Sequence, residues 1–235
     1  MNEDKVLVIV PTYNESKIIK DVLHEIKKYF NDAEILVIDG YSTDNTISIA
    51  KDENVRSILI DKTFGISLAV EAGILEAFNK KVSYLVRIDG DGQHPVKDVN
   101  NILNFAIQNK IDLLIGSRFL EKADYETNNL RLLGIKLLKK LLKIFYKVDI
   151  SDCTSGCQVF SKRLIKELIE DKNFEYSEIG AICKTKKIGY SIQEKFINMR
   201  PRITGTSSFN FVNSFKYMFK NLLAIITSAS FNLRK

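Results

Sequence analysis

The sequence has little proline, cysteine or histidine, and each shortage argues against a class of structure or chemistry. With only three prolines in 235 residues, long disordered linkers are not expected. The three cysteines (Cys153, Cys157 and Cys183) are odd in number, and the first two lack the second pair that a zinc site needs. We therefore expect plain thiols and a protein of the reducing cytoplasm.

Long hydrophobic runs are missing as well. The apolar run 6–10 is too short for the core of a signal peptide, so no export signal is expected. The longest uncharged stretch near the end of the chain, Asn221–Leu233, falls short of the ~20 residues that span a bilayer. Residues 209–235 are still rich in Phe and Leu, and we expect an amphipathic, apolar helical tail. It would lie on a membrane, pack on a membrane-protein partner or a second copy, or cover its own domain.

A glycine fingerprint is also absent, while the charge of the chain is informative. No GxGxxG follows the first expected strand, which argues against a Rossmann dehydrogenase.

The net charge of +6 favours anionic partners, namely nucleotides, anionic lipid headgroups or nucleic acid. Hydrophobic residues make up 45% of the chain, which is enough to bury a sizeable core.

The apolar residues alternate between strand and helix spacing along the chain. Strands are expected at 6–10, 34–38, 56–60, 84–88, 112–115 and 191–199, and residues 152–160 are expected to form a polar turn that runs into a further strand. Helices are expected at 16–30, 43–51, 65–79, 96–108, 130–147, from about 162, and at 174–187. This alternation predicts an α/β protein with a Rossmann-like, mostly parallel sheet flanked by helices.

Polar residues gather where the expected strands end. Pro11–Glu15 follows the first strand, Asp39 the second, Asp89 and Asp91 the fourth, and Arg118 the fifth. Ligands of such sheets sit at the carboxyl ends of the strands. We therefore expect residues from distant parts of the chain to meet at one edge of the sheet.

The turn after the fourth strand carries the strongest single signal. Asp89 and Asp91 are separated by Gly90, and the amide Gln93 follows. Two carboxylates and an amide oxygen on a turn suit a hard divalent ion such as Mg²⁺ or Mn²⁺, which most often serves the phosphates of a substrate. A solvated Asp/Gly turn is the simpler alternative, and the convergence of the strand ends favours the metal site.

The second half of the chain contains two basic segments. The expected helix 130–147 has a hydrophobic stripe interleaved with basic residues and no acid. It fits an anionic membrane surface, or else it packs on the sheet with its lysines in water. The loop 200–208 is basic and rich in hydroxyls, and is therefore able to hold phosphate.

These motifs, in this order, resemble those of a known family. Family 2 glycosyltransferases of the GT-A fold have motifs similar to Pro11-x-Tyr13-Asn14-Glu15, Asp39 with Ser42-x-Asp44-x-Thr46, and Asp89-x-Asp91-x-Gln93. The dolichol-phosphate mannose synthase branch and its bacterial polyprenyl-phosphate relatives resemble the chain at Gly116-Ser117-Arg118, Asp152-x-Thr154-Ser155-Gly156 and Arg202-x-x-Gly205-x-Ser207. The resemblance covers about residues 5–208, most of the chain.

The resemblance implies a role for each matching position. The nucleotide sugar, a GDP- or UDP-hexose, would be held by Pro11, Tyr13, Glu15, Asp39, Asp89, Gly90, Asp91, Gln93, Arg118 and Arg202. The metal would bind Asp89, Asp91 and Gln93, and the phosphate of the acceptor would bind Arg131 and Arg202. The residues implied in catalysis are Asp91, Asp152, Arg118 and Arg202.

The implied reaction transfers a hexose, mannose or glucose, to a polyprenyl phosphate with inversion at the anomeric carbon. A lipid phosphate is already anionic and needs no general base, which is compatible with a chain that has only two histidines. A hydroxyl acceptor, such as a growing glycan, is the second hypothesis, with Asp152 as a base. A glycosyltransferase-like binding protein without catalysis is the third. The resemblance places the enzyme peripherally at the cytoplasmic face of the membrane, with no nucleic-acid partner.

Two positions depart from the family pattern. The paired acids that usually follow the second strand are Asp39-Gly40 here, which leaves one carboxylate for the base. The motif after Arg202 usually ends in Ser-Lys and here ends in Ser207-Ser208, as in some bacterial relatives. We expect one GT-A domain at 1–208, with a nucleotide-binding half at 1–120 and an acceptor-side half at 121–208, followed by the tail at 209–235.

Overall fold

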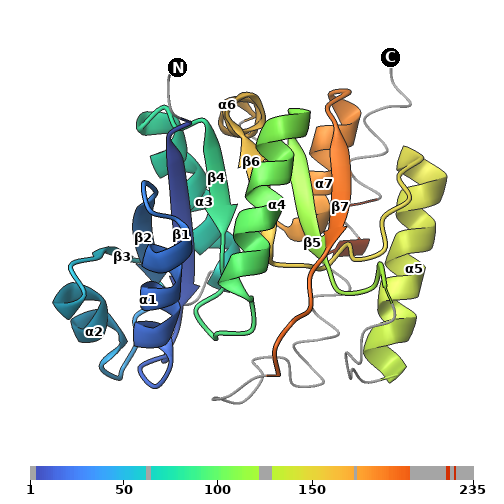
Figure 1. The fold of residues 1–235 in the computed structure, drawn as a ribbon. Helices are drawn as coiled ribbons and strands as arrows, with labels where there is room; N and C mark the ends of the chain where they lie inside the picture. The colour runs from blue at the N-terminus through green and yellow to red at the C-terminus, as the bar shows by residue number, and fades with distance from the viewer. Residues whose placement is uncertain are drawn as a thin grey trace.

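A central sheet flanked by helices on both faces organises the chain (Figure 1). The computed structural model describes residues 4–61, 65–121, 129–171, 174–201, 221, 222 and 225, without the side chains of residues 129–131. Within this part, seven strands form one sheet in the order β3-β2-β1-β4-β6-β5-β7. The α/β class expected from the sequence is confirmed.

The elements alternate in the order that the hydrophobic pattern predicts. The strands are β1 (Val6–Thr12), β2 (Glu34–Asp39), β3 (Arg56–Leu59), β4 (Tyr84–Arg87), β5 (Leu113–Ser117), β6 (Gln158–Ser161) and β7 (Ile192–Phe196). The helices are α1 (Ile19–Tyr29), α2 (Thr46–Asp52), α3 (Gly65–Asn79), α4 (Val96–Asn109), α5 (Asn129–Tyr146), α6 (Lys162–Glu170) and α7 (Glu178–Lys187). Each strand and helix predicted between residues 6 and 199 is therefore present, with bounds shifted by a few residues.

The direction of β6 decides which loops share an edge of the sheet. β6 pairs antiparallel with β4 and with β5, whereas the other strand pairs are parallel. The carboxyl ends of β1, β2, β4, β5 and β7 therefore lie at the same edge as the amino end of β6. As a consequence, the loop that enters β6 lies beside Asp89 at the end of β4, and its Asp152 contacts Arg118 at the end of β5.

Two hydrophobic layers hold the helices against the sheet. One face packs against α3, α5, α6 and α7, and the other against α1, α2 and α4 (Figure 1). The alternating residues of β1 serve both layers, because Leu7 and Ile9 face the first and Val8 and Val10 the second. All four side chains are fully buried, and the strand is apolar up to Thr12, as expected for a strand covered on both faces.

The seventh helix begins later than its sequence pattern suggests. The sequence predicts a helix from Phe174, but α7 begins at Glu178. The hydroxyl of Ser177 accepts a hydrogen bond from the Gly180 backbone N–H (2.9 Å) and thereby caps the helix. The preceding residue, Tyr176, instead donates its backbone N–H to Glu71 of α3 at 2.6 Å. The stretch before Ser177 is thus tied to a neighbouring helix rather than to its own.

The three thiols are buried and free, as the sequence indicates. Burial raises the pKa of Cys153, Cys157 and Cys183 to about 12 in each case. A thiol with such a pKa carries very little thiolate near neutral pH and is a poor nucleophile. These cysteines are packing residues.

Several residues named from the sequence lie outside the described part of the chain. These are Arg202, the rest of the loop 202–208, the side chain of Arg131, and the tail except Asn221, Leu222 and Ile225. These three tail residues are helical, and the Tyr146 hydroxyl of α5 donates to the Ile225 carbonyl at 3.2 Å. Ile225 is fully buried, so this part of the tail packs on its own domain. Among the described helices, none has both the length and the apolar character needed to cross a bilayer.

Candidate active site

The loops that follow β1 and β2 are fastened to each other by hydrogen bonds. The Gly40 backbone N–H donates to the Thr12 carbonyl (2.9 Å), and the Asn14 backbone N–H donates to the Ser42 hydroxyl (2.7 Å). The Thr43 backbone N–H donates to the Asn14 side-chain oxygen at 2.7 Å. The two motifs that the sequence places 25 or more residues apart therefore form one rigid unit.

Asp39 links the two loops through its carboxylate. It is fully buried, and its carboxylate accepts hydrogen bonds from the hydroxyls of Thr12 (2.8 Å) and Ser42 (2.6 Å) and from the Ser42 backbone N–H (2.7 Å). Both oxygens are thus engaged by the chain itself. The contact between Asp39 and a nucleoside, which the resemblance implies, stays a prediction.

Asp44 fixes the outer part of the same unit. Its carboxylate accepts hydrogen bonds from the hydroxyl and backbone N–H of Thr46 and from the backbone N–H of Ser16. Partial burial works to raise the pKa of Asp44, but these hydrogen bonds outweigh it and lower the pKa to about 2. Asp44 is therefore charged at any physiological pH, and its role is to hold the entrances of α1 and α2 together.

The acidic turn after β4 is held in shape by His94. The Asp89 backbone N–H donates to Nδ1 of His94 at 3.0 Å, so the proton of the neutral ring lies on Nε2. The ring is almost completely buried, and burial lowers its pKa against the opposing influence of Asp89 and Asp91. His94 is therefore neutral near pH 7 and organises the turn. Gly92 completes the turn with a φ of 75°, a conformation that favours glycine.

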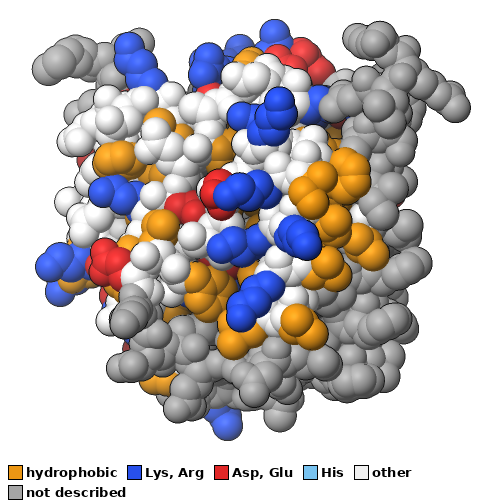
Figure 2. Space-filling view, turned by 90° about the vertical axis from the view of Figure 1, so that its right-hand side faces the viewer, with side chains coloured by type: hydrophobic (Ala, Val, Ile, Leu, Met, Phe, Trp, Pro, Cys, Tyr) orange, Lys and Arg blue, Asp and Glu red, His pale blue; other side chains and the backbone are white. Residues whose placement is uncertain are grey.

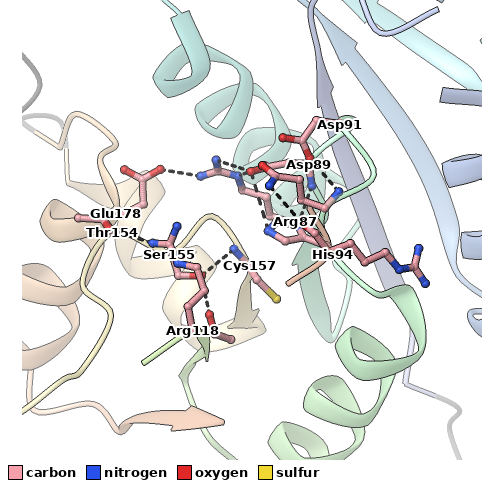
Figure 3. A network of polar contacts seen from close by, with 12 residues as sticks. Arg87, Asp89, Asp91, His94, Arg118, Thr154, Ser155, Cys157 and Glu178 are labelled. Atoms are coloured by element: carbon pink, nitrogen blue, oxygen red, sulfur yellow. Dashed lines mark hydrogen bonds and ion pairs between the residues drawn. The ribbon is translucent and has the colours of Figure 1, made fainter. Parts of the chain in front are cut away.

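A buried arginine on β4 ties this turn to α7 (Figure 3). Nε of Arg87 donates to Oδ1 of Asp89 (2.9 Å), and one Nη of Arg87 donates to Glu178 (2.8 Å) and to the Tyr176 hydroxyl (3.0 Å). Burial works to lower the pKa of Arg87, but Asp89, Tyr176 and Glu178 more than offset it and hold the pKa well above its ordinary value. The guanidinium is therefore a permanent cation between two carboxylates.

The pKa of Asp89 is lowered by its ion pair with Arg87. Burial works to raise the pKa of the Asp89 carboxyl, but Arg87 and His94 outweigh that influence and hold the pKa below its usual value.

The loop that enters β6 passes directly beside the ion pair of Arg87 and Asp89. A Cβ atom on Gly156 would lie 2.5 Å from Oδ2 of Asp89 and 2.8 Å from an Nη of Arg87, so only glycine allows this approach.

The charges of the turn fit a divalent cation. Asp89, Asp91 and Glu178 contribute three carboxylates against the single guanidinium of Arg87, which leaves two negative charges. Among the described residues, no three His, Cys, Asp or Glu side chains are grouped so that they could hold a metal ion. Two carboxylates that share a cation with the phosphates of a substrate are the usual arrangement for Mg²⁺. The residues present therefore fit an ion that also binds a diphosphate.

Gln93 has a different set of contacts from the one that the resemblance implies. Its side-chain Nε2 donates to the Arg200 carbonyl (3.2 Å), and its own carbonyl accepts from the Arg200 backbone N–H (2.9 Å). Arg200 in turn forms a bidentate ion pair with Glu25 of α1. Gln93 thus fastens the chain that leaves β7, just before Arg202, to the acidic turn. Its role as a metal ligand stays a prediction.

Arg118 and Asp152 form a buried, bidentate ion pair. Nε and one Nη of Arg118 donate to the two oxygens of Asp152 at 2.6 and 2.7 Å, and the same Nη reaches the Thr154 hydroxyl at 3.0 Å. Glu194 of β7 holds this loop by accepting the backbone N–H groups of Ser151 and Asp152. In this arrangement Asp152 orients the guanidinium. Its service as a general base, and the binding of phosphate by Arg118, stay predictions.

Among the described residues, the structure gathers those named from the sequence at one edge of the sheet and adds others. The turn Asp89–Gln93 lies beside the loop that enters β6, and the paired loops lie at the ends of the adjacent strands β1 and β2. Sequence reasoning missed the roles of Arg87, Tyr176 and Glu178. A signal for Arg87 exists, because a charged residue inside the buried strand Tyr84–Arg87 requires a paired partner.

Comparisons with known proteins agree on a family. The model of glycosyl transferase family 2 matches residues 7–169. The chain is 28% identical to the UDP-N-acetylglucosamine–dolichyl-phosphate N-acetylglucosaminyltransferase of Methanococcus voltae, over 80% of this chain and 83% of that protein. It is 25% identical to the polyprenol monophosphomannose synthase of Mycolicibacterium smegmatis, over 92% of this chain and 85% of that protein.

A solved structure agrees on the fold. Glucosyl-3-phosphoglycerate synthase of Mycobacterium tuberculosis, in complex with Mn²⁺, UDP-glucose and phosphoglyceric acid, superposes with a TM-score of 0.72. The match covers 97% of this chain and 80% of that chain at 17% sequence identity. At that identity the likeness bears on the fold alone, and it confirms the GT-A architecture.

Proposed function

Because the chain belongs to glycosyl transferase family 2, we propose that this glycosyltransferase moves mannose or glucose from a GDP- or UDP-sugar to a polyprenyl phosphate, with Mg²⁺ or Mn²⁺. The similarity to the dolichyl-phosphate and polyprenol enzymes supports the lipid acceptor. The Mn²⁺ and UDP-glucose in the synthase of the same fold support the cation and the donor class.

The contacts of Asp152 and His94, two groups that could accept a proton, are the main support for a phosphate acceptor. Asp152, which the resemblance implies as a base for a hydroxyl acceptor, is engaged by Arg118, and His94 accepts the Asp89 backbone N–H. A hydroxyl acceptor would need one of them to take a proton, whereas a phosphate acceptor brings an oxygen that is already anionic. The geometry therefore favours the phosphate.

The reaction follows from the placement of charge. The bond between the anomeric carbon and the diphosphate breaks, and a phosphate oxygen of the lipid attacks the same carbon from the opposite face. Asp89 and Asp91 would hold the divalent cation, which neutralises the charge that develops on the leaving diphosphate. Arg87 orients Asp89, His94 holds the turn, and Arg118 presents a fixed guanidinium at the end of β5.

The acceptor is tested directly with purified protein, Mn²⁺ and radiolabelled UDP-glucose, GDP-mannose or UDP-N-acetylglucosamine. We expect label in a polyprenyl-phosphate product with at least one donor, and none with the dephosphorylated polyprenol. Transfer to free sugars or to glycan fragments, without transfer to polyprenyl phosphate, would establish the hydroxyl-acceptor alternative. The absence of transfer to any acceptor, with intact nucleotide binding, would support a binding protein.

The outer face of α5 supports a membrane surface as the second partner (Figure 2). Ile135, Leu138 and Leu142 are buried against the domain. The opposite side exposes large hydrophobic residues, with 65% of Leu133, 47% of Leu137, 59% of Ile144 and 50% of Phe145 accessible. Four exposed lysines lie among them, at positions 136, 140, 143 and 147. Hydrophobic and basic residues on one helix face suit anionic lipid headgroups.

Charge reversal on α5 should release the protein from anionic vesicles. We expect the double variant Lys136→Glu/Lys140→Glu to bind phosphatidylglycerol vesicles about tenfold or more weakly, because each lysine near such a surface contributes ~1 kcal/mol. Vesicle sedimentation measures the change. The matched control is Lys51→Glu/Lys97→Glu, which reverses two exposed lysines on α2 and α4. Equal weakening in both variants would mean that net charge, rather than α5, governs the binding.

A further inference from the structure

Two exposed tyrosines occupy equivalent places on the paired loops after β1 and β2. Tyr13 lies between Thr12 and Asn14, and Tyr41 lies between Gly40 and Ser42. The hydrogen bonds from Gly40 to Thr12 and from Asn14 to Ser42 join the residues on either side of the two tyrosines. Tyr13 and Tyr41 therefore stand opposite each other, with 47% and 59% of their surfaces exposed.

The backbone of Tyr41 is held in a conformation that a tyrosine rarely adopts. Its φ is 59°, in the left-handed region, where a bulky side chain costs energy and glycine does not. Such strain persists where the surrounding structure imposes it, and it concentrates at ligand-binding sites. Here the two loops impose it through their mutual hydrogen bonds. The fold therefore retains an exposed aromatic ring at a position whose backbone conformation glycine would adopt without strain.

The carboxylate of Asp39, at the end of β2, already has three hydrogen-bond donors within the chain. Asp39, which lies next to Gly40, receives donors from Thr12 and Ser42 on both carboxylate oxygens. The Asp39 side chain is also fully buried, so it is less accessible to a nucleobase than the two exposed tyrosines. Every nucleobase has a π face on which an aromatic ring stacks.

We propose that Tyr41 is a second aromatic contact of the nucleobase, which it holds together with Tyr13 at the ends of β1 and β2. The inference rests on the proposed function, because it assumes that a nucleoside diphosphate binds at this edge of the sheet. Tyr41 contributes to the affinity for the nucleoside and leaves the binding of the diphosphate at the acidic turn unchanged. Stacking of this kind tolerates different bases, so it acts on UDP and GDP alike.

The test compares Tyr41→Gly and Tyr41→Phe with the wild-type protein by calorimetric binding of UDP, GDP and pyrophosphate in Mn²⁺. We expect Tyr41→Gly to weaken UDP and GDP ~5- to 150-fold, the range that the loss of one stacked base implies. Tyr41→Phe should bind both within about twofold of wild type, because it keeps the ring. Pyrophosphate, which has no base, should bind all three proteins equally.

Thermal unfolding separates this role from a structural one. Glycine relieves the strain at a positive φ, so Tyr41→Gly should unfold at the same or a higher temperature than wild type. The control is Lys110→Gly, which relieves a similar φ of 51° at the end of α4, with unchanged nucleotide affinity. Unchanged UDP and GDP affinity in Tyr41→Gly, or an equal loss for pyrophosphate, would overturn the inference. A wild-type protein that binds neither nucleotide would overturn the proposed function instead.

Discussion

The Asp91→Asn protein is expected to lose ~10²- to 10³-fold in turnover of the nucleotide sugar, the cost of removing a principal electrostatic stabiliser of a leaving group. Asp91 is nearly buried, and its Oδ1 accepts the Gln93 backbone N–H at 3.1 Å. Asparagine keeps an acceptor oxygen at that place, so the turn retains its shape while one negative charge is removed. The cation would then lose one of its two carboxylate ligands.

An exposed carboxylate at the end of α2 provides the control for this result. Asp52→Asn removes the same charge from outside the acidic turn, and turnover should stay close to that of wild type. Steady-state kinetics with varied Mn²⁺ measures both variants. If Asp91→Asn kept wild-type turnover at saturating Mn²⁺, the assignment of the metal to this turn would be wrong.

The Arg87→Met protein should unfold with ~3–5 kcal/mol less free energy than wild type, because the change removes the cation between two buried or partly buried carboxylates. The side chains of Arg87 and Glu178 are 3% and 7% exposed, so water screens this interaction very little. Asp89, at 26%, is reached by water to a limited degree. Methionine fills a similar volume, which leaves the unpaired charges as the main cost.

Two further variants show whether the unpaired charges cause the loss of stability in the Arg87→Met protein. Arg163→Met removes an arginine whose side chain is 59% exposed and which pairs with the buried Asp112. Asp112 keeps its hydrogen bonds from Ser161 and Ser191, and water reaches the arginine, so this variant should lose much less stability in urea unfolding than Arg87→Met. Adding Glu178→Gln to Arg87→Met should recover part of the lost stability. If the Arg87→Met and Arg163→Met proteins lost equal stability, the buried network would not be a major stabiliser of the fold.

The sequence could predict the strands, the helices and the strand-end motifs for a specific physical reason. β1 and β2 are apolar runs that stop at polar residues, and a parallel sheet brings such stops to one edge. The position of β6 could not be read in the same way. Its four residues, Gln158–Ser161, carry no sign that the strand runs antiparallel between β4 and β5. That reversal places Asp152 and Gly156 at the site.

The partners of the site residues were also beyond sequence reasoning. Asp152 and Arg118 are 34 residues apart, and Arg87 and Glu178 are 91 apart, so only the folded chain shows that they pair. The residue type of Tyr41 did not indicate a binding role, since exposed tyrosines are common on loops. Its significance comes from its φ of 59° and from its place opposite Tyr13, both of which are properties of the backbone.

The central claim is that the acidic turn holds a divalent cation jointly with the diphosphate of a nucleotide sugar. Electron paramagnetic resonance of Mn²⁺, titrated into the protein with and without UDP or GDP, tests it most directly. We predict weak binding of Mn²⁺ alone, since two carboxylates are present, and much tighter binding of one ion when the nucleotide is added, with both signals reduced in Asp91→Asn. Mn²⁺ binding that is unaffected by either nucleotide, or by the Asp91→Asn change, would contradict the account.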